Sequence, residues 1–246
     1  MTSSLGLDSV PGVSTVYGST MAEAYLRGRN LRAEDMSAWL AAAAPFLPGP
    51  GGRILDLGAG TGRFTAALGE VATVIACEPS AAMRAVFPGG QLLVGGSAEA
   101  IPLAAASFEA VWASQMVHHV KDLEAFAGNV RRVLKPGGHL LLRGGFGELP
   151  LTRWFPEAFA ADAEGLLGVV TARLAEVGLT LTARIEVGQR YADSAQELVD
   201  KVRTRSLSNL AVLADDHFAD GLRALEQDAP GLTYPLDEQL ELVVFG

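Results

Sequence analysis

The stretch ILDLGAGTGRF, from Ile54 to Phe64, decides the fold of this chain. Its apolar start is typical of a buried strand, and it runs into a turn with glycines at Gly58, Gly60 and Gly62. Glycine accepts positive φ and lets the backbone approach a ligand closely, and a helix that follows such a turn begins with unpaired N–H groups. The stretch therefore predicts a strand, a ligand-binding turn and a helix, in that order.

The chain around this stretch repeats the same alternation. Between residues 53 and 145, short apolar runs alternate with segments long enough for helices, which predicts βα units on a parallel sheet. Beyond that region the pattern predicts mostly helix over 156–177, a strand over 179–187, helices over 194–227 and a final strand over 240–245. We expect an α/β fold with one core.

Composition narrows the classes of function. The 246 residues carry 28 acidic and 19 basic side chains, a net charge of −9, whereas a protein whose main ligand is nucleic acid needs a basic surface. Cys77 is the single cysteine, so no disulfide forms within the chain. The start of the chain has no signal-peptide pattern, and no apolar run is long enough to span a membrane. We expect a cytoplasmic protein that binds neither nucleic acid nor membrane.

The glycine spacing separates two kinds of nucleotide site. A dinucleotide fingerprint requires its third glycine at position 63, where this chain has Arg63. The pattern is GxGxG, which lowers the support for an NAD-dependent oxidoreductase. It resembles motif I of the class I S-adenosylmethionine-dependent methyltransferases.

Two further strings carry that resemblance. GGSAEAIPLAAASFEAVWASQMVHHV (95–120) and RRVLKPGGHLLLR (131–143) resemble the ubiquinone and menaquinone biosynthesis type of methyltransferase. The resemblance covers about residues 54–143, and one departure from it is Glu109, where that family usually has aspartate. It implies a Rossmann-like sheet of seven mostly parallel strands with an antiparallel last strand, helices on both faces and a helical cap.

The resemblance also implies a division of the chain. We expect one methyltransferase domain over 1–246, with an N-terminal helical lid (1–50), a cofactor-binding core (51–147) and the rest of the sheet (148–246), interrupted by a cap insertion at about 190–232. The implied cofactor is S-adenosyl-L-methionine. The residues that the resemblance assigns to it are Tyr25, Arg29, Asp56, Gly58, Ala59, Gly60, Glu78, Pro79, Met83, Ser97, Ala98, Glu99, Ser114 and Gln115.

Glu78 has support of its own. It ends the second apolar run, VATVIACE, where a carboxylate can accept both hydrogen bonds of a ribose diol. An acid at a strand end can equally be a solvated surface group. Its place after the glycine turn favours the ribose interpretation.

His118 and His119 follow the fourth predicted strand and are candidates for a general base. A neutral imidazole suits proton transfer near neutral pH. The alternative is that these histidines only pack or hydrogen-bond, because methyl transfer from a sulfonium to a nucleophilic acceptor needs mainly alignment.

Substrate-binding candidates lie in the second half of the chain. Arg143 follows an apolar strand and would hold an anionic substrate group, or else reach a surface acid. Trp154 and Arg203 would line a closing cap, although such residues commonly just pack or solvate a helix. His217 stands among acids without a second ligand cluster, so we predict no metal.

These patterns favour methyl transfer to an oxygen, nitrogen or carbon atom of a small molecule, in specialised metabolism, by a monomer or homodimer. One alternative is a protein that binds an adenosyl cofactor for a role other than methylation. The NAD-dependent oxidoreductase is the weaker alternative.

Overall fold

The computed structural model describes residues 31–147, 150–159, 163–205 and 207–246. Within these ranges seven strands form one sheet, in the order β3-β2-β1-β4-β5-β7-β6. The strands are β1 (Arg53–Leu57), β2 (Thr73–Cys77), β3 (Leu92–Val94), β4 (Phe108–Ser114), β5 (Leu134–Gly144), β6 (Leu181–Ala192) and β7 (Leu236–Phe245).

The strand directions confirm the expected sheet. Strand β1 pairs in parallel with both β2 and β4, and β4 pairs in parallel with β5. Strand β7 runs antiparallel to its neighbours β5 and β6. Because the strand order reverses next to β1, the carboxyl ends of β1 and β4 border the topological switch point, where α/β sheets bind ligands.

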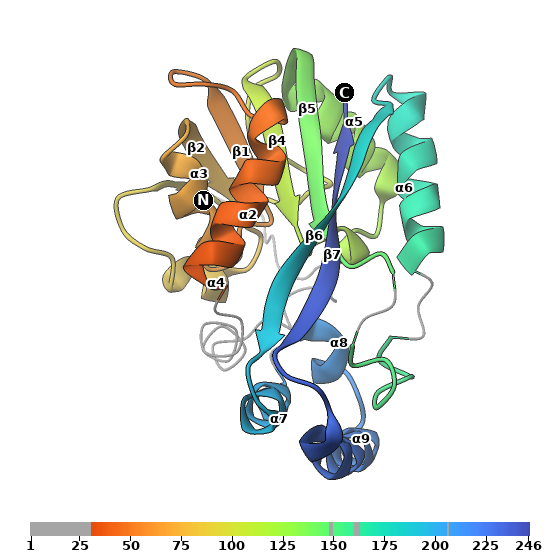
Figure 1. Ribbon diagram of the computed structural model, residues 1–246. Coiled ribbons are helices and arrows are strands. Elements are labelled where there is room, and N and C mark those ends of the chain that lie inside the picture. The colour runs from red at the N-terminus through yellow and green to blue at the C-terminus, as the bar shows by residue number, and fades with distance from the viewer. Residues whose placement is uncertain (1–30, 148–149, 160–162, 206) are drawn as a thin grey trace, which may run out of the picture.

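Helices cover both faces of the sheet, as expected (Figure 1). The helices α2 (Ala33–Ala43) and α3 (Arg63–Gly69) pack on one face, and α5 (Leu123–Val133) and α6 (Ala163–Glu176) pack on the other. The short helix α4 (Ala81–Ala85) follows β2. The described residues also include the 3₁₀ turns η1 (Ala44–Phe46), η2 (Val117–His119) and η3 (Ala229–Gly231).

Helix α5 illustrates how the local sequence sets an element. The Asp122 side chain caps its start by accepting a hydrogen bond from the Ala125 amide at 2.9 Å. Phe126, Val130 and Val133 recur at helical spacing and are buried against the sheet. A capped start and a single apolar face fix both the beginning of α5 and the side that it turns to the core.

The core has one apolar cluster on each side of the sheet. In β4, Val111 and Ala113 belong to the cluster under α5 and α6, whereas Ala110 and Trp112 belong to the cluster under α2 and α3. All four are at most 2% exposed. Burial on both faces explains why the parallel strands read as continuous apolar runs in the sequence.

A third apolar cluster is formed by the segment between β6 and β7 together with residues of the 150–159 segment. The segment between β6 and β7 holds α7 (Ala195–Arg203), α8 (Ser208–Ala211) and α9 (Asp215–Asp228), and we call residues 195–231 the cap. Figure 1 shows the cap helices at the lower end of the sheet, which is the end where the parallel strands finish. The cap therefore lies on the same side of the molecule as the switch point.

The expected start of one helix was wrong. Residues 150–159 form turns, and the helix expected from Pro156 begins as α6 at Ala163. Trp154 and Phe155 pack into the cap cluster, with Phe155 closely packed at Gly221 of α9, so tertiary contacts replace helical ones here.

Truncating the centre of the sheet should destabilise the protein strongly. Leu141 of β5 is fully buried, so Leu141→Ala leaves a cavity and should lower the free energy of unfolding by about 2–5 kcal/mol. Leu181 of β6 is 50% exposed, and Leu181→Ala should change it by no more than about 0.5 kcal/mol. Urea unfolding followed by circular dichroism measures both variants, and equal losses would contradict the assigned core.

Candidate functional site

The glycine turn after β1 is bound to the end of β2. Gly58, Gly60 and Gly62 have φ values of +69°, +59° and +83°, so this conformation favours glycine at all three positions. The amides of Gly58 and Ala59 donate to the Cys77 carbonyl, at 2.8 and 3.2 Å. The structure thus brings together the three residues predicted in this turn, Gly58, Ala59 and Gly60.

Glu78 fixes the turn from the neighbouring strand. Its carboxylate accepts hydrogen bonds from the Gly60 amide at 2.9 Å and from the Ser80 amide at 2.8 Å. The side chain is buried, and this burial raises its pKa, while the two amide donors act in the opposite direction. Glu78 is therefore a buried acid held at the switch point, and the solvated surface alternative was wrong.

Asp56 lies within β1, and only Leu57 separates it from Gly58, the first glycine of the turn. Its carboxylate accepts a hydrogen bond from the Thr65 hydroxyl of α3 at 2.5 Å. Complete burial raises the pKa of Asp56 to about 7; the Thr65 bond lowers it, and the nearby Glu78 charge raises it further. Asp56 ties β1 to the helix that follows the turn.

The end of β4 forms the other side of the switch point. Gln115 has a φ of +55°, an uncommon value for a residue other than glycine and one that marks a strained turn. Its amide donates to the Arg143 carbonyl at 2.7 Å, and the Arg143 guanidinium donates to the Ser114 hydroxyl at 3.1 Å. A Cβ built at Gly58 would lie 3.0 Å from the Met116 Cβ, so this segment contacts the glycine turn.

The two candidate bases lie directly after this segment. His118 and His119 belong to η2, and their rings are tilted against each other with centroids 4.0 Å apart. His118 is exposed and His119 is half-buried. The structure places both near the carboxyl end of β4, and the role of either as a base stays a prediction.

The loop predicted beside the adenine is fixed from two sides. Ser97 forms an isolated bridge with Ala100, Ala98 is buried, and the Glu99 carboxylate accepts the Lys121 amide at 3.1 Å. The Asn129 side chain of α5 also donates to the Glu99 carbonyl at 2.8 Å. These contacts hold residues 97–99 against the segment that follows η2.

Other predicted residues lie in different surroundings. Pro79 is exposed after β2, and Met83 is buried on α4. Trp154 is buried in the cap cluster, where its Nε1 donates to Asp228 at 3.0 Å. Tyr25 and Arg29 lie outside the described residues. The substrate role of Trp154 and the cofactor roles of the other four stay predictions.

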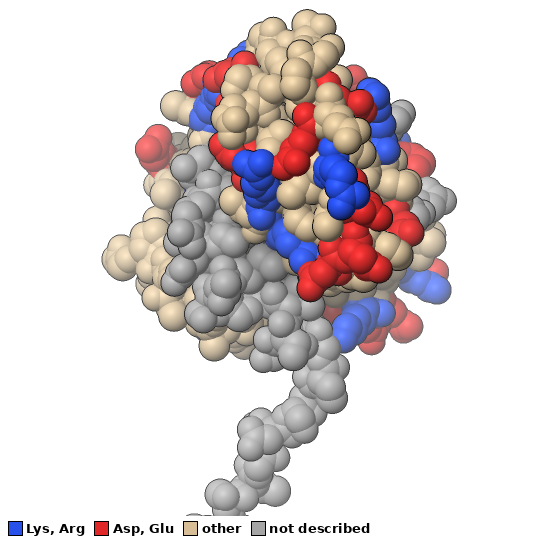
Figure 2. All heavy atoms as spheres, turned by 90° about the horizontal axis from the view of Figure 1, so that it is seen from below, with Lys and Arg blue, Asp and Glu red and all other residues tan. Residues whose placement is uncertain are grey.

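The surface of the cap carries charges of both signs. Figure 2 shows Lys and Arg side chains beside Asp and Glu side chains at this end of the molecule. Arg203 contacts Asp200 at 3.0 Å and Glu226 at 2.7 Å, so its guanidinium already binds two carboxylates of the cap. The proposed substrate role of Arg203 would have to compete with these ion pairs.

Arg143 is one of the few buried charged residues in the described ranges, with 4% of its surface exposed. Its guanidinium lies 4.3 Å from the centre of the Trp39 ring and donates to the Gln189 side chain at 2.5 Å. Arg143 is the next-to-last residue of β5 and lies at the carboxyl end of that strand. Nothing in the sequence indicated that Gln189 and Trp39 contact Arg143, because neither residue stands in a recognisable motif.

The arrangement fits a nucleoside with a ribose diol. A carboxylate can accept about four hydrogen bonds, and the two amide bonds to Glu78 leave capacity for a diol. The glycine turn and the segment after β4 lie side by side at the carboxyl ends of β1 and β4. No set of three His, Cys, Asp or Glu side chains suited to a metal occurs in the described ranges. No helix among the residues that the structure describes could cross a membrane.

Comparisons with known proteins agree with this geometry. Residues 55–142 match the family described as "Methyltransferase domain". An uncharacterized methyltransferase of Mycobacterium tuberculosis is 40% identical over 133 residues, which cover 52% of this chain and 51% of the relative. The 27-O-demethylrifamycin SV methyltransferase of Amycolatopsis mediterranei is 29% identical over 212 residues, 76% of each protein. The chain thus spans about half the length of the first relative.

A solved structure shares the fold. A protein from Anabaena variabilis, proposed to be a methyltransferase of an antibiotic biosynthesis pathway, has a TM-score of 0.72 with this chain. The two are 23% identical, and the match covers 85% of this chain and 96% of that protein. The likeness extends the shared architecture well beyond residues 55–142.

Adding a methyl group at Gly62 should strain the turn. An alanine there would adopt a φ of +83° and place its Cβ 2.7 Å from the Phe87 ring. Gly62→Ala should therefore lower the free energy of unfolding by about 1–3 kcal/mol. Gly69 lies in α3 with open space around it, so Gly69→Ala should stabilise by up to about 1 kcal/mol. Denaturant titration of both variants tests this, and a stable Gly62→Ala protein would refute the assigned strain.

The raised pKa of Asp56 predicts a pH dependence of stability. The folded protein binds this proton more tightly than the unfolded chain, so the stability that Asp56 contributes is fully present below about pH 4 and is lost as the pH rises through about 7. Asp56→Asn cannot ionise. As the pH increases between these two values, the free energy of unfolding of the variant should therefore increase relative to that of the wild type. Urea unfolding of both proteins measures this difference. A difference that stays constant across that pH range would contradict the burial of an ionisable Asp56.

Proposed function

We propose that this chain is an S-adenosylmethionine-dependent methyltransferase that methylates a small molecule, on the basis of the methyltransferase-domain match over residues 55–142. The acceptor is an oxygen, nitrogen or carbon atom, and the pathway is one of specialised metabolism. A relative named for a rifamycin methylation supports the pathway class. The observation that carries the proposal is the buried Glu78 carboxylate bound to the glycine turn at the switch point.

Each part of the proposed site has a proposed task. Glu78 accepts the ribose hydroxyls, and the turn at Gly58–Gly60 lets the backbone approach the methionyl part. The loop at 97–99 lies beside the adenine, and Ser114 and Gln115 face the methionine. We keep Asp56, Pro79, Met83, Tyr25 and Arg29 as further proposed cofactor residues.

The cofactor supplies an electrophilic methyl group on a sulfonium. The residues of the chain then need to orient the acceptor and exclude water, and alignment of this kind can be worth effective molarities of 10⁵ M or more, on the order of 7 kcal/mol. His118 or His119 would remove a proton from the acceptor where one must leave. Arg143, Trp154 and Arg203 remain the proposed substrate residues.

The organisation of the chain is part of the proposal. It comprises one methyltransferase domain with an N-terminal lid over 1–50, a core over 51–147 and the remaining sheet with its cap. The active form is a monomer or homodimer. A cofactor-binding protein that does not methylate would have the same pocket, and formation of S-adenosylhomocysteine in the presence of candidate acceptors separates the two functions.

Changing Glu78 should weaken binding of S-adenosylhomocysteine. Glu78→Gln puts an NH₂ group where a carboxylate oxygen now accepts hydrogen bonds, so both the turn and the diol contact suffer. The dissociation constant should rise about 5- to 150-fold, which corresponds to 1–3 kcal/mol. Isothermal titration calorimetry measures it directly.

Glu70 provides the matched control for this experiment. It is exposed after α3, and Glu70→Gln should leave the dissociation constant unchanged. If Glu78→Gln binds as tightly as wild type, the ribose assignment is wrong. If wild-type protein binds NAD but not S-adenosylhomocysteine, the proposed function itself is wrong.

A further inference from the structure

We infer that Gln189 of β6 is a positioning residue for the methionine side of the cofactor site. It acts through Arg143, whose guanidinium it holds against the Ser114 hydroxyl. The inference rests on the proposed function, because that proposal places Ser114 beside the methionine. Gln189 lies more than forty positions beyond the matched family segment, in a strand without any motif.

The amide of Gln189 has a single orientation that satisfies its neighbours. Its Oε1 accepts hydrogen bonds from Arg143 at 2.5 Å and from the Trp39 indole at 2.9 Å. Its Nε2 donates to the Glu238 carboxylate, which stands directly opposite on β7. Two donors on one side and a carboxylate on the other side determine which end of the amide carries the oxygen.

Arg143 connects Gln189 to the end of β4. Its guanidinium is stacked on Trp39 and donates to the Ser114 hydroxyl, and its carbonyl accepts the Gln115 amide. Ser114 and Arg143 are also direct neighbours in the β4–β5 register. The side chain of Ser114 and the strained turn at Gln115 are therefore both held by one buried residue.

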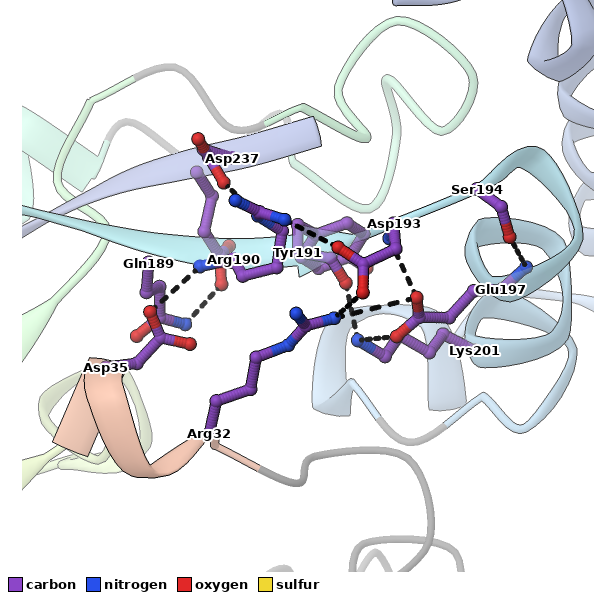
Figure 3. Close-up of polar contacts among 11 residues, drawn as sticks. Arg32, Asp35, Gln189, Arg190, Tyr191, Asp193, Ser194, Glu197, Lys201 and Asp237 are labelled. Atoms are coloured by element: carbon purple, nitrogen blue, oxygen red, sulfur yellow. Dashed lines mark hydrogen bonds and ion pairs between the residues drawn. The ribbon is translucent and has the colours of Figure 1, made fainter. Parts of the chain in front are cut away.

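Helix α2 packs on one face of the sheet and contacts Gln189 through Trp39. Next to Gln189, the Arg190 amide donates to the Asp35 carboxylate at 3.2 Å, and Figure 3 shows Asp35 directed at this part of β6. Figure 3 also shows the ion pair between Arg32 and Asp193, at the end of the same strand. Arg32, Asp35 and Trp39 recur at helical spacing, so one side of the α2 segment meets the end of β6.

Loss of the Gln189 acceptor should release this arrangement. The Arg143 and Trp39 donors that it serves belong to buried residues, and a buried donor left without an acceptor is costly. The guanidinium then has reason to move toward another acceptor, and Ser114 loses its fixed partner. A merely structural role for Gln189 would lower stability without selecting one part of the ligand.

Two ligands test this selectivity. S-adenosylhomocysteine carries the amino-acid part that Ser114 is proposed to face, and 5′-methylthioadenosine lacks it. In Gln189→Met, calorimetry at a temperature where the variant is folded should show binding of S-adenosylhomocysteine weakened about tenfold and binding of 5′-methylthioadenosine unchanged. Gln239→Met is the control, because Gln239 is an exposed glutamine of β7 and should bind both ligands as wild type does.

Exchanging the side chains of Gln189 and Glu238 tests whether binding can be rescued. Gln189→Glu alone places a second carboxylate opposite Glu238 and should weaken binding of S-adenosylhomocysteine. The double variant Gln189→Glu with Glu238→Gln restores an amide–carboxylate pair that still presents an oxygen to Arg143, so binding should return toward the wild-type value. This comparison decides the matter even if Gln189→Met does not fold.

Three outcomes would overturn the inference. Equal weakening of both ligands in Gln189→Met would indicate a general structural role. Wild-type affinity in Gln189→Met, or a double variant no better than Gln189→Glu, would show that the Gln189 acceptor does not position the site. Failure of wild-type protein to bind S-adenosylhomocysteine is a separate result, which would refute the proposed function and the inference with it.

Discussion

The hydrogen bond between the Glu78 carboxylate and the Gly60 amide joins the two loops on which the proposed site depends. One loop leaves β1 and the other leaves β2, and their strands are neighbours in the sheet. A buried carboxylate must be satisfied by donors, since burial without them is costly. The amides of Gly60 and Ser80 meet that requirement, and the turn thereby acquires a fixed distance from the acid.

Ionisable groups buried at the carboxyl edge follow the same logic. Asp56, Glu78 and Arg143 are each at most 6% exposed, and each is bound by neutral partners within the fold. Neutral partners satisfy the hydrogen-bonding capacity of a buried charged group, but they do not cancel its charge. That charge can still interact with a charged ligand. Both signs of charge at this edge agree with the proposed cofactor, which carries a sulfonium and an amino-acid part.

Much of this site could be predicted from the chain order alone. The glycine turn and Glu78 stand at strand ends, and parallel neighbours bring their carboxyl ends to one edge. Their contacts therefore follow from the βα alternation. Trp154 shows the limit of such reasoning, since the sequence did not predict its packing against α9 or its hydrogen bond to Asp228. Packing between distant segments has no signature in local spacing.

The sequence by itself determined the class of sheet, the glycine turn and the acid beside it, because these features depend on backbone conformation and on alternation over a few residues. Only the tertiary structure decided that Gln189 and Trp39 surround Arg143, since α2, β5 and β6 are far apart in the chain. The choice of partner for a buried guanidinium depends on which acceptors the packed fold brings within hydrogen-bonding distance. Neither residue type nor spacing along the chain specifies that distance.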